Sequence, residues 1–114
     1  MQIEFKQLGN VGVIELDGDL NVVKVDAFRE AFKNWFLPNP AIKNVVVDMG
    51  KVSMIDSAGL GLLIAFLKQI RERDGDLNLA ALQKRVKLVF DITRTKRIFG
   101  VYDSQADAVA AFKD

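Results

Sequence analysis

Apolar positions along the chain are densest between Val45 and Ile64. Three consecutive valines, 45–47, have no polar break and predict a strand that is covered on both faces. The four residues that follow, up to Lys51, are expected to turn the chain out of the sheet. After Ser57, positions 58–67 are apolar all round, which predicts a helix inserted into the core. Ser57 is therefore expected where a buried strand leads into a buried helix, with its hydroxyl presented at the surface.

The segment before this stretch predicts a hairpin followed by a helix. Residues 2–6 alternate between polar and apolar, and residues 11–16 form a returning strand after a turn at Gly9–Asn10. Asn21 is the expected N-cap of the next helix. Prolines 38 and 40 end that helix. Its apolar side chains recur at helical spacing and are expected in the core: Val25, Phe28, Phe32 and Trp35.

The C-terminal half predicts further alternation of strands and helices. The central helix is expected to end near Gly75, and a short strand follows over 77–81. A third helix over about 83–92 and a weaker strand over 98–102 come next. A capping-box pattern at 104–107 starts a final helix. Its inward positions are expected to be Ala106, Val109, Ala110 and Phe112.

The element order β-β-α-β-α-β-α-β-α predicts an α/β fold, with a mixed sheet opened by a hairpin and packed by about four helices. With 114 residues, 50% of them hydrophobic, one domain spanning residues 1–114 is expected. The chain has no cysteine and no histidine, which excludes disulfides, thiolate sites and histidine chemistry. Sixteen basic and fifteen acidic residues are mixed along it, so no nucleic-acid stripe stands out.

The N-terminal residues carry charges, and no run of 18 apolar residues occurs. We therefore expect a cytoplasmic domain without membrane insertion, without a metal and without a cofactor.

Asp56 and Ser57 allow two interpretations. Serine is a favoured N-cap residue, and Asp-Ser before a helix is commonly structural. Alternatively, the hydroxyl is a modification site, because a helix N-terminus can hold a phosphate without disrupting the fold. Asp56 is expected to cap the helix or to orient the hydroxyl. Gly59 and Gly61 each cost about 1 kcal/mol against alanine, which indicates close approach of a neighbouring segment or a partner.

Several segments together resemble a STAS domain, in particular the bacterial anti-sigma factor antagonists. Val45–Asp48 and Met54–Gly61 carry most of the resemblance, supported by Gly18–Leu20 and Leu88–Asp91. The most specific run comprises Asp56, Ser57, Ala58, Gly59, Leu60 and Gly61.

This resemblance implies that Ser57 is phosphorylated by an anti-sigma factor that is also a serine kinase. The unphosphorylated form would bind that partner and release a sigma factor, the phosphorylated form would let go, and a serine phosphatase would restore it. The chain itself would not be an enzyme. Asn21 departs from the acidic residue common in the family and flanks the expected partner surface. Ala58 replaces a second hydroxyl residue, which leaves Ser57 as the sole hydroxyl of the motif.

Other classes of protein find less support in the sequence. A Ser-Lys hydrolase would need a base near Ser57, but Lys68 lies about 16 Å further along the same helix. Lys51 is possible by spacing, yet no oxyanion or triad pattern accompanies it. A dinucleotide site would need a third glycine at Ile64, and no P-loop motif is present.

Three alternatives stay open from the residues alone. Asp48 at the end of a central strand would suit an aspartyl-phosphate receiver domain, although such domains do not begin with a hairpin. A STAS scaffold subunit of a stress-signalling or transporter complex would bind partners without a serine switch. Lys84, Arg85 and Lys87, at the start of the third helix, indicate either a partner contact or a solvated face.

Overall fold

The computed structural model describes residues 1–112 and confirms the predicted α/β class and order of elements. The last two positions of the predicted domain lie outside the described residues. The elements are β1 (Gln2–Leu8), β2 (Val11–Asp17), α1 (Val25–Phe36), β3 (Asn44–Lys51), α2 (Ser57–Glu72), β4 (Leu77–Ala80), α3 (Lys84–Ile92), a 3₁₀ turn η1 (Thr95–Arg97), β5 (Gly100–Tyr102) and α4 (Gln105–Ala110).

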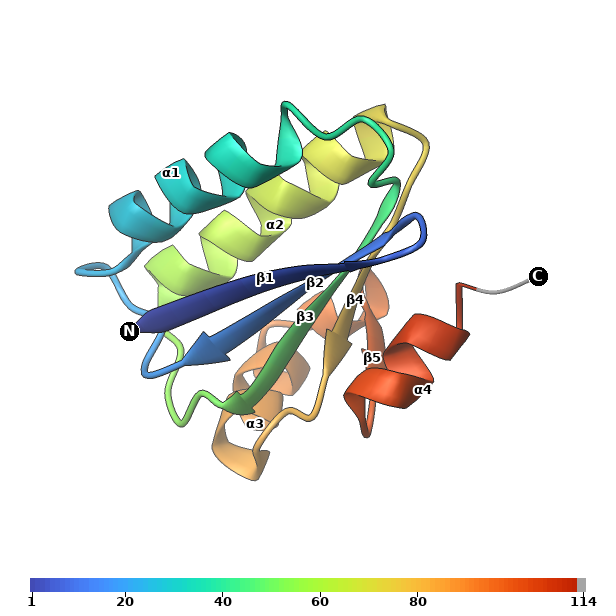
Figure 1. Ribbon diagram of the computed structural model, residues 1–114. Helices are drawn as coiled ribbons and strands as arrows, with labels where there is room; N and C mark the ends of the chain where they lie inside the picture. The colour runs from blue at the N-terminus through green and yellow to red at the C-terminus, as the bar shows by residue number, and fades with distance from the viewer. Residues whose placement is uncertain (113–114) are drawn as a thin grey trace.

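Within residues 1–112 the five strands form one sheet in the order β1-β2-β3-β4-β5. β1 and β2 are antiparallel and form the predicted hairpin, whereas every later neighbour is parallel. Crossover connections of this kind need helices to cover the sheet. In Figure 1, α1 and α2 lie side by side across one face, and α4 lies away from them on the other.

The buried valines of β3 divide between the two faces of the sheet. Val45 and Val47 join the larger core, which α1, α2 and α3 cover. Val46 points to the opposite face, where Ala108 of α4 packs against it. The prediction of a strand covered on both faces is therefore confirmed. This arrangement fixes the end of β3, and hence the start of α2, on a rigid support.

β3 continues through the four residues of the predicted turn and ends at Lys51. The expectation that the chain leaves the sheet after Val47 is wrong, because Asp48 still pairs with Glu15 of β2 and Lys51 pairs with Asp17. Met49 is fully buried and continues the alternation of the strand. The chain leaves the sheet only after Lys51, through a short loop into α2.

Asn21 does not cap α1, so the expectation of an N-cap at Asn21 is wrong. α1 begins at Val25, and Lys24 occupies its N-cap position without a side-chain hydrogen bond. Asn21 instead closes a turn before the helix: its Oδ1 accepts a hydrogen bond from Val23 N at 3.1 Å, and its carbonyl accepts one from Lys24 N at 2.9 Å. Asn21 thus shapes the loop rather than the helix end.

Three smaller expectations are also corrected. β5 starts two residues later than predicted, because the N–H of Ile98 bonds back to Thr95 in η1. In α4, Ala108 is the buried alanine, while Ala106 and Ala110 are exposed. α2 is not covered all round, and its outer face exposes Gly61, Ala65 and Lys68.

No helix within the described residues is long and apolar enough to cross a membrane.

Candidate functional site

Two loops at the carboxyl ends of β2 and β3 are joined through Leu20. Its N–H donates to Met54 O at 3.0 Å, and its carbonyl accepts from Asp56 N at 3.2 Å. These bonds form an isolated parallel bridge between Leu20 and Ile55. Leu20 is fully buried, so it holds both loops on the core. The segment that precedes α1 and the segment that precedes α2 therefore form one surface.

Asp56 is the N-cap of α2 and ties the two loops together a second time. Its Oδ1 accepts a hydrogen bond from Gly59 N at 2.8 Å, and its Oδ2 accepts one from Val22 N at 2.9 Å. The bond from Gly59 is the main reason that the pKa of Asp56 lies below its usual value, with Val22 adding to it. The carboxylate is therefore ionised at neutral pH, and the capping role expected for Asp56 is confirmed.

The two glycines of the motif have different surroundings. A Cβ on Gly59 would stand 2.5 Å from Leu20 O, so this position tolerates only glycine without displacement of the Leu20 loop. A Cβ on Gly61 would meet nothing within 4 Å, and Gly61 is exposed. Close approach of a neighbouring segment is thus confirmed for Gly59, whereas Gly61 leaves an open, flat place on the outer face of α2.

Ser57 is the first residue of α2, and its side chain is exposed. The N-cap interpretation is wrong for Ser57, because Asp56 occupies that position. Within residues 1–112 the Ser57 hydroxyl makes no hydrogen bond, whereas the Asp56 carboxylate accepts two. A free hydroxyl at the positive end of a 16-residue helix is accessible to a modifying enzyme.

The remaining motif residues divide between the surface and the core. Leu60 is buried, and Ala58 is half-buried against the same core. Asn21 lies on the adjoining loop, half-buried. The structure therefore brings together Asn21, Asp56 and Ser57 at one edge of the sheet, while Leu60 supports them from below.

Exposed apolar side chains beside Ser57 were not anticipated from the sequence. Val22 is 65% exposed, Val23 78% and Met54 51%. Val22 and Val23 lie on the loop that Asp56 holds, and Met54 lies on the loop that leads to Ser57. The sequence did contain a signal for this exposure: Val22 and Val23 fall outside the helical spacing of apolar residues that starts at Val25. The two loops that lie beside the start of α2 therefore both present exposed apolar side chains.

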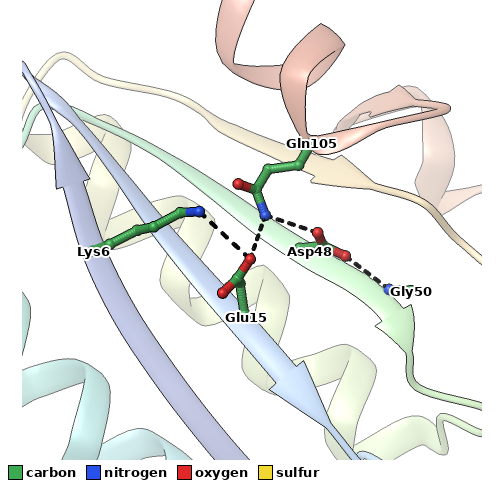
Figure 2. Close-up of polar contacts among 5 residues, drawn as sticks. All are labelled: Lys6, Glu15, Asp48, Gly50 and Gln105. Atoms are coloured by element: carbon green, nitrogen blue, oxygen red, sulfur yellow. Dashed lines mark hydrogen bonds and ion pairs between the residues drawn. The ribbon is translucent and has the colours of Figure 1, made fainter.

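A second polar cluster lies on the face of the sheet that α4 covers (Figure 2). Gln105 donates from Nε2 to both Glu15 Oε2 at 2.7 Å and Asp48 Oδ2 at 2.8 Å. Lys6 Nζ lies 3.6 Å from Glu15 Oε2, and Asp48 Oδ1 accepts from Gly50 N at 2.9 Å. The bond from Gln105 is the main reason that the pKa of Glu15 lies below its usual value. This cluster attaches α4 to the sheet and keeps both oxygens of Asp48 bonded within the fold.

Among the described residues, no three acidic side chains come together in a way that could hold a metal ion.

Comparison with known proteins agrees with this geometry. A family model described as STAS domain matches residues 2–108. The chain is 30% identical to the anti-sigma-B factor antagonist of Staphylococcus epidermidis over 88 residues, which cover 77% of this chain and 80% of that protein.

It is 41% identical over 71 residues to BtrV of Bordetella bronchiseptica, which bears the name of an anti-sigma factor antagonist. That match covers 62% of this chain and 61% of BtrV, less than two thirds of either. The fold also matches the Bacillus cell fate determinant SpoIIAA in its phosphorylated form, with a TM-score of 0.74 and 17% identity, over 98% of this chain and 100% of that one.

Proposed function

The chain belongs to the STAS domain family, among the anti-sigma factor antagonists, and from that premise we propose that it is a phosphorylation-controlled binding module. In this proposal the unphosphorylated chain binds an anti-sigma factor with serine kinase activity and so releases a sigma factor. Phosphorylation of Ser57 by that kinase ends the interaction, and a serine phosphatase restores it. The chain catalyses nothing itself and acts in the cytoplasm.

The observation that carries the proposal is the free hydroxyl of Ser57 at the start of α2. The structural role that a serine usually has at a helix start belongs to Asp56, whose carboxylate caps the helix. Ser57 can therefore gain a phosphate without the loss of any bond that holds the fold. The solved structure of SpoIIAA in a phosphorylated form is consistent with this for a protein of the same fold.

The surroundings of Ser57 explain why a phosphate would weaken binding. A partner that covers Val22, Val23 and Met54 would also remove Ser57 from water. Phosphorylation adds about −1.5 to −2 charges, next to the ionised carboxylate of Asp56. Burial of that charge without a compensating cation costs several kcal/mol, and about 1.4 kcal/mol corresponds to a tenfold loss of affinity. A loss of two or more decades is therefore expected.

The test is affinity purification of the tagged full chain from its source cells, combined with mass spectrometry of the Ser57 peptide. Wild type is compared with Ser57→Ala and Ser57→Asp, and Ser53→Ala is the matched control on the same loop. We expect Ser57→Ala to retain a kinase-like anti-sigma factor permanently and Ser57→Asp to lose it. Ser53→Ala should behave as wild type.

Two results would contradict the proposal. One is a Ser57 peptide that carries no phosphate in any growth condition. The other is equal recovery of the same large assembly by wild type, Ser57→Ala and Ser57→Asp, which would favour a scaffold subunit without a serine switch.

A further inference from the structure

Positive charge is concentrated in one short stretch of the chain. Between Lys84 and Arg97 lie six of the 16 basic residues but one of the 15 acidic residues. The rest of the chain then carries ten basic and fourteen acidic residues and is net negative. The stretch comprises α3 and η1, which pack against each other beside β5 at the end of the sheet. The near-neutral total therefore hides a basic region on one side of the molecule.

The basic residues of α3 are not explained by the stability of the helix. Lys84 and Arg85 occupy the first turn of α3, where the positive end of the helix dipole disfavours cations. That turn has no acidic residue, and Gln83 at the N-cap makes no side-chain cap. All three basic side chains of the helix, including that of Lys87, are exposed. Their placement is better explained by an external ligand of opposite charge.

A groove lies between α3, η1 and β5, with a volume of about 420 Å³. Leu82, Phe90 and Val101 provide its apolar part, and Phe90 is itself fully buried. The polar part is entirely cationic: Lys87, Lys96 and Arg97.

The three cations differ in whether a carboxylate of the chain neutralises them. Lys96 Nζ lies 3.0 Å from Asp91 Oδ1. Lys87 and Arg97 have no carboxylate within ion-pair distance among the described residues. The groove thus offers an apolar floor and two unneutralised charges.

We propose that this groove binds an acidic segment of a partner protein, with an apolar side chain of the segment over Leu82 and Val101 and its carboxylates on Lys87 and Arg97. Charge complementarity selects an anion, and the apolar floor selects a peptide over a phosphate backbone. The lining of the groove shares no residue with the surface around Ser57.

The experiment uses the uniformly ¹⁵N-labelled full chain and a labelled synthetic peptide, Asp-Glu-Leu-Glu-Phe-Asp. Amide shifts in NMR spectra locate the binding, and fluorescence anisotropy measures the affinity. Two control peptides replace either the acidic residues by amides or Leu and Phe by serine. The double variant Lys87→Gln/Arg97→Gln is compared with Lys33→Gln/Lys43→Gln, which removes the same charge from exposed positions in α1 and just before β3.

We expect the peptide to shift amides of α3, η1 and β5 and to bind more tightly than either control peptide. Loss of the two groove cations should weaken it about tenfold or more, the Lys33/Lys43 pair should leave it nearly unchanged, and Ser57→Ala should have no effect.

Absence of binding, or equal loss in both double variants, would overturn the proposal. Tighter binding of a DNA duplex or of vesicles containing phosphatidylglycerol would overturn the choice of an acidic protein segment. Self-association that depends on Lys87 and Arg97, seen by sedimentation, would assign the groove to a second copy of this chain instead.

Discussion

The dipeptide Asp-Ser occurs twice in this chain, each time at the start of a helix, and the two copies have different roles. At α4, Ser104 is the N-cap and its Oγ accepts a hydrogen bond from Asp107 N at 3.1 Å, while Asp103 is exposed. At α2 the helix begins one residue earlier relative to the dipeptide. Asp56 is the cap and Ser57 is the first helical residue, with its hydroxyl free.

A shift of one residue therefore decides whether a serine supports the fold or is available to a partner. The cause lies outside the dipeptide. The bridge between Leu20 and Ile55 holds the chain extended up to Asp56, and Val22 N fixes the aspartate carboxylate. Among residues 1–112 no hydrogen bond holds the Asp103 carboxylate, and Ser104 takes the capping position, as the intrinsic preference of serine allows.

The largest effect is expected at Gly59. Gly59→Ala should destabilise the chain by about 1–3 kcal/mol, because the new methyl group meets Leu20 O and forces the two loops apart. Gly61→Ala is the matched control and should stabilise by up to about 1 kcal/mol, since its methyl group meets nothing and alanine favours the helix. Urea unfolding measures both, and equal effects would refute the close approach at Leu20.

The second-largest loss of stability is expected from removal of the α2 cap. Asp56→Ala should cost about 1–2 kcal/mol, because both Gly59 N and Val22 N lose their acceptor. Asp103→Ala, the equivalent position before α4, should change stability by no more than about 0.5 kcal/mol. Hydrogen exchange should show faster exchange at Val22 only in Asp56→Ala, and a similar loss in both variants would show that the two dipeptides are equivalent.

For the two serines the larger loss of stability is expected at α4, whereas for the two aspartates it is expected at α2. Ser104→Ala is expected to cost about 1 kcal/mol through loss of the α4 cap. Ser57→Ala should stay within about 0.5 kcal/mol of wild type, although it abolishes the proposed switch. Thermal unfolding of the two variants in parallel makes the comparison, and a large cost at Ser57 would mean that its hydroxyl supports the fold.

The smallest effect is the pH dependence that Asp56 contributes. Its pKa is lower in the folded chain than in the unfolded chain, so the carboxylate stabilises the fold above its unfolded pKa of about 3.9. That contribution is lost as the pH falls through the lower, folded value. Asp56→Asn keeps a capping oxygen without the charge. The stability difference between wild type and Asp56→Asn should therefore shrink below about pH 4, and a difference that grows there would contradict the assignment.

Much of the fold followed from patterns that are local in the sequence. Period-two alternation in β1, the valine run in β3 and the spacing of Val25, Phe28 and Phe32 in α1 each reflect a face that must be buried. The capping box of α4 was equally local and was confirmed. The error at β3 arose from a contact elsewhere in the chain, because pairing with β2 prolongs the strand. The error at Asn21 was local, because its side chain accepts from Val23 N two residues on and closes a turn instead of capping α1.

The sequence by itself determined the class of fold, the order of its elements and the position of a serine at the start of a helix, because these depend on periodicity and local preference. Tertiary structure alone decided which residue caps α2, which valines stay exposed beside Ser57 and which cations meet around an apolar groove. Those outcomes depend on residues that are far apart in the chain: Asp56 N bonds to Leu20 O, and Lys87 and Val101 line the same groove. No local pattern records such distances, and only the folded backbone brings these groups together.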